Sequence, residues 1–361
     1  MEAPPTGYRS RYRKPDPARG PKRFPTERDI AILKRLDLRR FSAANWLHHF
    51  VGGSYTRFDH RMSQLFDGGY VGRMDEYLHP DTVHSRHLVY FLTDKGRRAL
   101  VDDGIQPMHG STRLYLHECL TSFVYDSIEI GCLELDLTYR GWNVLQHDER
   151  IPARHSERPF KIKLSNSYLN LDGSPFVISR GEQSLCIPGV EIDRNTEPLR
   201  SYVLREKWTD KFRALKEFIR NRVYQSHFGF PNCLIPIYTT NREHMHNMIA
   251  LAYDTIGRSP ALLFQFTEDL PKARVFPKPN GSMLTEPYLR IDQPPFHLAE
   301  GLLNPAPPPK PQGGVVYGEN CDGWEYYIGH APNRVFYEGR FNTEAEARAA
   351  LARQLKLKGL M

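Results

Sequence analysis

Apolar positions follow two clear patterns in the middle of the chain. Residues 184–190 form a short apolar run, which is typical of a buried strand. A polar stretch follows, and from Trp208 to Val223 apolar residues recur every three or four positions, as on one face of a helix. The pattern therefore predicts a buried strand and then a helix that packs back on the sheet.

Two acidic residues end this predicted strand. Glu191 and Asp193 flank Ile192, and successive side chains of a strand point to opposite faces, so both carboxylates are expected on the face opposite Ile192. Open α/β sheets usually place ligand sites at strand ends of this kind. Glu191 and Asp193 are therefore candidate site residues. The alternative is a structural role, in helix capping or in ion pairs with Arg194 or Arg200.

The rest of this half of the chain alternates helices and strands. Amphipathic patterns predict helices over residues 114–131 and 243–256. Apolar runs predict strands over residues 142–146, 168–171, 176–179, 233–238 and 261–266. A long helix between two buried strands favours a right-handed crossover and parallel pairing. Residues 113–270 are therefore expected to form an α/β domain with a mixed sheet that ends at its strand 261–266.

A shorter pattern precedes this domain. Helices are predicted to start near Thr26, Ser42 and Ser54, followed by two β-like runs and a fourth helix at Thr93. Three helices, a hairpin and a helix is the order of a winged helix, which is expected over residues 26–103.

The third of these helices carries the candidate DNA contacts. In helix-turn-helix proteins the corresponding helix lies in the major groove, where Arg and Gln side chains read base edges. Its polar face and the adjoining wing offer six candidate DNA-binding residues: Arg57, His60, Arg61, Gln64, Arg73 and Arg86. The alternative is a winged helix that binds protein, in which these side chains form a solvated face.

The segments outside these two domains have distinct compositions. Residues 1–25 form a basic arm with few apolar positions, expected to be disordered when free, and either to follow phosphates or to serve as a solubilising tail. Residues 271–315 are rich in proline and are expected to form an extended linker. The hydrophobic pattern of residues 316–361 predicts a small ββα unit. The expected fold class is α/β, or α+β over the whole chain.

Composition narrows the classes of partner and compartment. The sequence has a formal net charge of +7 over 361 residues, which is compatible with a nucleic-acid partner. Its five cysteines are scattered, so neither a zinc ribbon nor a disulfide framework is expected. It contains neither the apolar core of a signal peptide nor an apolar run long enough to span a membrane. A cytoplasmic protein without membrane contact is therefore expected, of unknown oligomeric state.

The first two predicted domains resemble the replication-relaxation family, which is encoded largely on plasmids and integrated elements. The resemblance covers about residues 25–240. It rests on Tyr90-Phe-Leu-Thr-Asp-Lys-Gly96, the helix with His117, Leu171-Asp172-Gly173, and Glu191-Ile-Asp193 followed by Thr196. It implies a DNA-binding protein of a plasmid, phage or integrated element that acts in DNA replication, relaxation or mobilisation. The implied partners are double-stranded DNA and other replication or mobilisation proteins.

The α/β half also resembles the restriction-endonuclease-like nuclease core. That core places an Asp in one strand and an acid-x-Lys tripeptide in the next; the acids hold a divalent metal and the lysine positions or activates water. The resemblance implies that Asp172, Glu191 and Asp193 are metal ligands, with Mg²⁺ as the cofactor if the nuclease is active. The sequence departs from the pattern at Asp193, which stands where lysine is expected. Lys211 or Lys207, from the following helix, is the candidate substitute, and Lys211 is the candidate catalytic residue.

Three functions stay open from the sequence. The first is a DNA-binding protein whose nuclease-like domain is degenerate and acts as a scaffold. The second is a Mg²⁺-dependent DNA nuclease or nickase, and the third is a non-enzymatic adaptor that binds protein. We expect Asp172 to converge with Glu191 and Asp193 at one end of the sheet. Lys211 reaches them only if its helix turns that side chain toward the strand ends.

Overall fold

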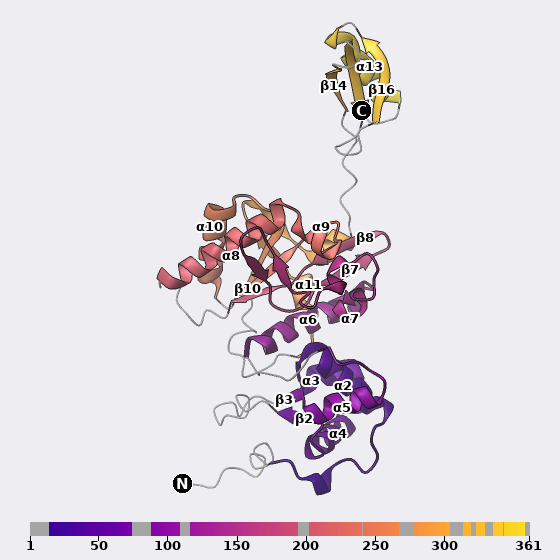
Figure 1. Cartoon of the computed structure of the whole chain (residues 1–361), viewed down its shortest axis with the longest axis vertical. Coiled ribbons are helices and arrows are strands. Elements are labelled where there is room, and N and C mark those ends of the chain that lie inside the picture. The colour runs from indigo at the N-terminus through magenta and orange to yellow at the C-terminus, as the bar shows by residue number, and fades with distance from the viewer. Residues whose placement is uncertain are drawn as a thin grey trace. The chain divides into compact units, whose positions relative to one another are not determined.

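The computed structural model describes ten stretches of the chain. They are residues 14–73, 88–108, 116–193, 202–239, 241–266, 278–303, 313–318, 323–328, 335–341 and 343–357. Over these residues the fold is mixed helix and sheet, with several small sheets (Figure 1). The chain divides into two compact units, Met1–Leu303 and Asn304–Met361.

The first elements of the larger unit follow the predicted order. They are α2 (Glu27–Arg39), β1 (Phe41–Ala43), α3 (Ala44–Val51), α4 (Tyr55–Asp67), β2 (Val71–Arg73), β3 (Val89–Leu92) and α5 (Asp94–Asp102), after a short turn η1 (Pro17–Arg19). The three strands form an antiparallel sheet in the order β1-β3-β2. Helix α2 begins with a capping box between Thr26 and Asp29, and Thr93 caps α5. Both predicted helix starts are confirmed.

One prediction in this region is wrong. Ser42 does not open a helix, because residues Phe41–Ala43 form strand β1 and helix α3 begins at Ala44. Phe41 and Ala43 are almost completely buried, and pairing with β3 satisfies the backbone of this buried stretch. The tertiary environment therefore outweighs the local capping signal of Ser42.

A second group of elements forms an antiparallel meander and then a parallel sheet. Helix α6 (Leu116–Glu134) precedes β4 (Thr138–Gly141), β7 (Phe176–Arg180) and β8 (Gln183–Ile187), which pair in the order β4-β7-β8. Strands β9 (Glu191–Asp193), β10 (Ile235–Thr239) and β11 (Leu262–Phe266) are parallel neighbours. Helices α8 (Tyr202–Arg220) and α10 (Arg242–Ile256) connect them. The predicted parallel pairing across these helices is confirmed.

Smaller elements complete this half. They are α7 (Trp142–Leu145), η4 (Pro152–His155), the hairpin of β5 (Lys161–Lys163) and β6 (Tyr168–Asn170), and α9 (Val223–Phe228). The strand predicted over residues 142–146 is wrong. Trp142 and Leu145 are buried three positions apart on helix α7, a spacing that suits one face of a helix, and the strand is β4, just before them.

The predicted proline-rich linker is also wrong over residues 278–303. This segment forms α11 (Ser282–Thr285), β12 (Tyr288–Arg290), β13 (Gln293–Phe296) and α12 (Leu298–Leu303). Strands β12 and β13 extend the sheet beyond β11, so β11 is not its last strand. Tyr288 is fully buried, and its hydroxyl lies 2.7 Å from that of Tyr238 on β10. Proline content misleads here because the prolines of β13 lie in an edge strand, where a missing N–H is tolerated.

The elements around α2 share a core with the α/β half. Trp46 of α3 packs on Phe123 of α6, with ring centroids 4.7 Å apart. Arg35 and Arg39 of α2 form ion pairs with Asp126 and Glu129 of α6. The predicted boundary at residues 103–112 therefore does not separate two compact units.

The smaller unit contains one more strand than predicted. Strands β14 (Gly313–Gly318), β15 (Gly323–Ile328) and β16 (Val335–Phe341) form an antiparallel sheet, followed by α13 (Glu344–Leu357). The first of these strands lies partly in the predicted linker. Among the described helices of both units, none is long and apolar enough to cross a membrane.

Candidate functional site

Asp172 lies beside the start of strand β9. Its backbone forms an antiparallel bridge with Val190, with N–H···O distances of 2.9 and 3.0 Å. Its carboxylate Oδ2 also accepts a hydrogen bond from the backbone N–H of Ile192 at 3.1 Å. These contacts hold the Asp172 carboxylate next to Glu191. The predicted convergence of these two acids is confirmed.

Glu191 is the most deeply buried acid of the group. Its side chain is 2% exposed; Oε2 accepts a hydrogen bond from Lys211, and Oε1 has no partner among the described residues. Burial raises the pKa of Glu191 to about 8, although the Lys211 ammonium opposes the shift. The charge of Asp172 raises the pKa of Glu191 further. An orphaned carboxylate oxygen and an acid neighbour are the features expected where a cation is to be bound.

Lys211 reaches the acids from helix α8. Trp208 and Phe212 pack that helix on the sheet, and Lys211 lies between them in sequence with its ammonium over the Trp208 ring at 5.6 Å. Burial lowers the pKa of Lys211, but the charges of Glu191 and Asp172 outweigh burial and leave this pKa above its ordinary value. Helix α8 therefore turns the Lys211 side chain toward the strand ends, as its candidate role requires. The side chain of Lys207 lies outside the described residues.

Asp193 has a different partner. Its Oδ2 lies 2.5 Å from Nε2 of His244, which is 6% exposed at the start of helix α10. Strand β9 pairs with β10 in parallel, so the helix that follows β10 begins beside the end of β9. Asn241 caps α10 by accepting from the His244 N–H. The sequence did not predict the contact of His244 with Asp193, although Asn241 three residues earlier signals a helix start at the sheet edge.

These residues suit a divalent cation with few protein ligands. Among the residues that the structure describes, no three His, Cys, Asp or Glu side chains are grouped to hold a metal ion. Mg²⁺ nevertheless binds through one or two carboxylates and completes its shell with water and substrate oxygens. Asp172 and the unpartnered Glu191 Oε1 fit that requirement. A third ligand from Asp193 stays a prediction, since His244 engages its carboxylate.

The candidate DNA contacts of α4 divide into two groups. Arg57 and His60 are exposed. Arg61 instead binds Asp29 through two hydrogen bonds, of 2.7 and 2.5 Å, and Gln64 through a third of 2.8 Å. Gln64 in turn contacts His60 at 3.2 Å. The polar face of α4 therefore presents fewer unengaged side chains than its sequence implies.

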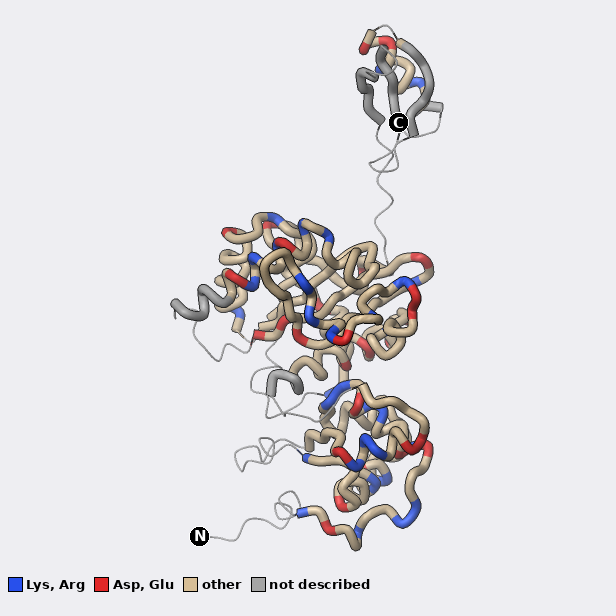
Figure 2. The backbone as a smooth tube through the Cα atoms, in the orientation of Figure 1, with Lys and Arg blue, Asp and Glu red and all other residues tan. Residues whose placement is uncertain are grey.

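The two arginines of the predicted wing are Arg73 and Arg86. Arg73 is half-buried, with its guanidinium 4.0 Å above the Phe66 ring. Arg86 lies outside the described residues. Figure 2 shows further Lys and Arg positions along α2 to α5, interspersed with acids.

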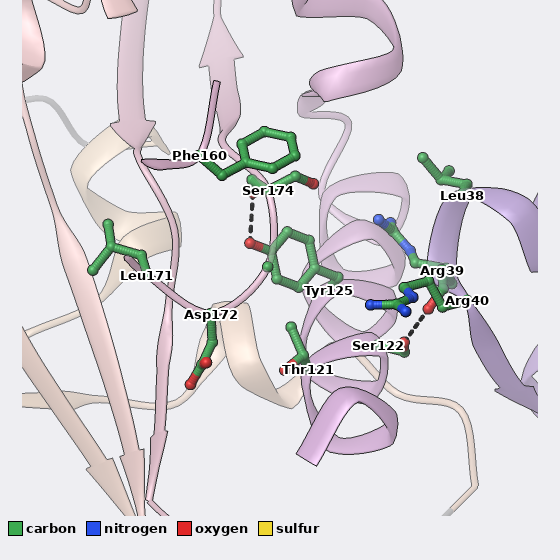
Figure 3. A pocket seen from close by; sticks show the side chains of 11 residues that line it. Leu38, Arg39, Arg40, Thr121, Ser122, Tyr125, Phe160, Leu171, Asp172 and Ser174 are labelled. Carbon is green, nitrogen blue, oxygen red and sulfur yellow. Dashed lines mark hydrogen bonds between the residues drawn. The ribbon is translucent and has the colours of Figure 1, made fainter. Parts of the chain in front are cut away.

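A cavity of about 330 Å³ adjoins Asp172 (Figure 3). Its wall includes the end of α2, the side of α6 and the loop from Leu171 to Ser174. Tyr125 of α6 fixes that loop by donating a hydrogen bond to the Ser174 carbonyl at 2.5 Å. Gly173 has a φ of +71°, and a Cβ there would lie 2.5 Å from the Tyr125 hydroxyl. The loop that carries Asp172 thus requires glycine at this position.

Comparison with protein-family models, curated proteins and solved structures found no significant match to this chain. The resemblances to the replication-relaxation family and to the nuclease core therefore stay predictions from the motifs quoted above.

Proposed function

We propose that this chain is a DNA-binding protein whose α/β half cleaves phosphodiester bonds with Mg²⁺. The observation that carries the proposal is the cluster of Asp172, Glu191 and Lys211, assembled from a loop, a strand and a helix. The order of strands and helices from α6 to β10 supports a restriction-endonuclease-like core. In that core Asp172 and Glu191 would take the positions of the catalytic acids, and Lys211 would substitute from helix α8 for the lysine that Asp193 replaces.

DNA binding is assigned to the elements α2 to α5, for which we propose a winged-helix fold. Their element order and the β1-β3-β2 sheet support that fold. Residues 1–102 carry 19 Lys and Arg against 12 Asp and Glu, so the formal excess of +7 of the chain falls within its N-terminal third. Such an excess favours contact with phosphates. Arg57 and His60, exposed on α4, are the residues best placed to make it.

Each residue of the cluster has a role that follows from its chemistry. Asp172 and Glu191 would hold the metal ion, which when bound supplies a hydroxide nucleophile at neutral pH and neutralises developing charge. Lys211 places a positive charge beside the acids, where it would attract a phosphate oxygen and offset the negative charge of Asp193. Asp193 is held by His244, which limits its repulsion of a phosphate.

Cleavage is tested on supercoiled plasmid with Mg²⁺ or Mn²⁺. We expect slow nicking by the wild type, lost in Glu191→Gln and in Lys211→Ala. Glu182→Gln, which removes an exposed carboxylate two residues after Arg180, is the matched control and should nick like the wild type. Nicking that survives Glu191→Gln would place the activity elsewhere or in a contaminant.

A second candidate function is DNA binding without cleavage, through a degenerate nuclease-like domain. Asp193 favours this candidate, because an acid occupies the position of the lysine in the core pattern. The Asp193 carboxylate is moreover already engaged by His244. Absence of nicking at every metal concentration, with intact duplex binding, would select this candidate. Affinity for duplex DNA that does not fall with salt would instead favour a protein-binding adaptor. The role in replication, relaxation or mobilisation of a mobile element rests on the family resemblance.

A further inference from the structure

We propose that a single nucleic-acid strand leaves the site at Asp172 along a basic, aromatic groove past Phe160, Arg158 and Lys161. This inference rests on the proposed function, because it names the form of substrate that the site receives. Its structural basis is a series of cavities, the charges on their walls and two aromatic rings.

Three cavities adjoin one another, and Asp172 lines the first of them. The cavity beside Asp172 shares Phe160 and Leu171 with a second cavity of about 480 Å³. The second shares Met108 and Gln146 with a third of about 1020 Å³. Because each cavity has two wall residues in common with the next, the three cavities adjoin one another. We infer that together they form the path of the strand.

Positive charge accompanies this path. Arg158 and Lys161 line the second cavity, and Lys34 and Arg154 line the third. Glu157 is the acidic residue on the wall of the second cavity. Arg35 and Arg39 also face the path, but their guanidinium groups are already paired with Asp126 and Glu129 of α6. Asp37 lines the third cavity but is buried. Arg158 and Lys34 are exposed, and Lys161 and Arg154 are half-buried. These four cations suit a chain of phosphates.

Two aromatic rings lie near these cations: Phe160 lines the first two cavities, and Tyr168 contacts Lys161 without lining any of the three cavities. Phe160 is half-buried and contributes to both of the first two cavities, while Trp142 supports its ring at a centroid distance of 5.3 Å. Tyr168, on the neighbouring hairpin strand, is 53% exposed, and the Lys161 ammonium lies 4.2 Å from its ring centroid. Basic side chains alternating with aromatic rings are the usual surface for a single strand, whose unpaired bases stack.

The size of the first two cavities argues against a duplex. The first two cavities have volumes within the range of pockets for one small ligand, roughly 300–1000 Å³. Such spaces accept one nucleotide unit at a time. Duplex DNA would instead be held by the α4 surface, so a substrate with both duplex and single-stranded parts fits the two surfaces together.

The test measures binding of a fluorescein-labelled oligothymidylate to the full chain by anisotropy, in EDTA so that cleavage plays no part. The variant is Arg158→Ala/Lys161→Ala. The matched control is Arg180→Ala/Arg213→Ala, which removes the same charge from two exposed positions, one at the far end of β7 from Ser174 and one on α8. A labelled blunt duplex is measured in parallel with each protein.

We expect the groove variant to lose on the order of tenfold in oligonucleotide affinity, with a salt slope smaller by about 1.4 for two lost phosphate contacts. Its duplex affinity and circular dichroism should equal those of the control. Phe160→Leu, which keeps the apolar volume without the ring, should also weaken oligonucleotide binding. Oligonucleotide affinity unchanged in both variants, or an equal loss for the duplex, would overturn the groove. A groove effect without any plasmid nicking would uphold the groove and reject the proposed cleavage.

Discussion

Arg61 of helix α4 binds both carboxylate oxygens of Asp29 at the start of helix α2, at 2.7 and 2.5 Å. The Asp29 side chain is completely buried, and the same carboxylate also closes the capping box with Thr26. Nη2 of Arg61 also donates a hydrogen bond to the Arg23 carbonyl at 2.8 Å, which ties down the chain before α2. Arg61 therefore joins two helices, and its guanidinium is engaged before any DNA arrives.

Arg61→Ala should lower the free energy of unfolding by about 3–5 kcal/mol, because it leaves the buried Asp29 carboxylate without its cation. Arg57→Ala, on the exposed face of the same helix, should change stability by less than about 0.5 kcal/mol. Urea denaturation followed by circular dichroism measures both. Equal stability of the two variants would show that the Arg61–Asp29 pair contributes little to folding.

The same pair predicts how stability depends on pH. Burial raises the pKa of Asp29, but hydrogen bonds from Arg61 and Thr26 outweigh it and lower that pKa below its ordinary value. The unfolded chain therefore binds more protons near pH 4, and this contribution is complete above the unfolded pKa and is lost as pH falls through the folded one. In Arg61→Ala, burial acts on Asp29 with less opposition. Its stability relative to the wild type should therefore improve as pH falls toward 4, as measured by urea midpoints.

The contrast between Arg57 and Arg61 shows where sequence reasoning stops. The 3.6-residue period placed Phe58, Met62 and Leu65 in the core correctly, because burial of apolar area dominates helix orientation. The period cannot say which polar residue finds a partner from a distant helix, since Asp29 lies 32 positions away. Arg61 and Arg57 are equivalent on the helix and differ only in tertiary context.

At the candidate site, too, some contacts could be predicted from the local sequence and others depend on distant partners. The convergence of Asp172 with Glu191 was predictable, because adjacent strands with a short connection pair readily. Lys211 was predictable only as a possibility, since helical spacing limits its direction but does not fix its reach. His244 was not predicted as a site residue, because its partner Asp193 is brought to it by the parallel pairing of β9 with β10. That pairing is set by the crossover helix and has no local signature.

Arg57→Ala/His60→Ala should weaken binding to duplex DNA while leaving the fold intact. Loss of one Arg–phosphate contact should reduce the slope of log affinity against log salt by about 0.9. Arg213→Ala, an exposed arginine of α8, serves as the control and should bind like the wild type. Binding is measured by anisotropy over a range of salt concentrations. A salt slope that is the same in all three proteins would remove α4 from the DNA interface.

The raised pKa of Glu191 predicts a second dependence of stability on pH, at the candidate site. Its folded pKa, about 8, lies above its ordinary value near 4.5, so the folded state binds more protons between these pH values. The free energy of unfolding should therefore fall as pH rises across this window, and this group should contribute at most about 1.4 kcal/mol per pH unit. Glu191→Gln should flatten the slope, and stability curves from pH 5 to about pH 9 measure it. A slope that persists in Glu191→Gln would assign it to other groups.

Lys211→Met removes the ion pair with Glu191 while the Glu191 side chain stays buried, so it tests the two effects on the Glu191 pKa separately. Lys211 lowers the pKa of Glu191, so its removal should extend the falling part of the stability curve to higher pH. The variant should resemble the wild type near pH 5, where Glu191 is protonated in both, and be less stable near pH 9. The double variant Glu191→Gln/Lys211→Met should recover much of that loss, because no buried charge is left unpaired. Additive effects of the two substitutions would contradict direct coupling.

Residues 278–303 should be indispensable for folding of the larger unit, although their composition predicts a linker. They place Leu284, Tyr288, Leu298 and Leu302 in the same core as α6, and Ser127 of α6 contacts Asn280 and Met283 through its hydroxyl. Each large apolar side chain lost from a core costs about 1.5–3 kcal/mol, and whole domains are stable by only about 5–15 kcal/mol. A chain ending at Phe266 should therefore not unfold cooperatively. A chain ending at Leu303, which keeps the whole compact unit, should melt in a single sharp transition by circular dichroism. Cooperative melting of the shorter chain would show that the segment from α11 to α12 is an appendage on a core that is complete without it.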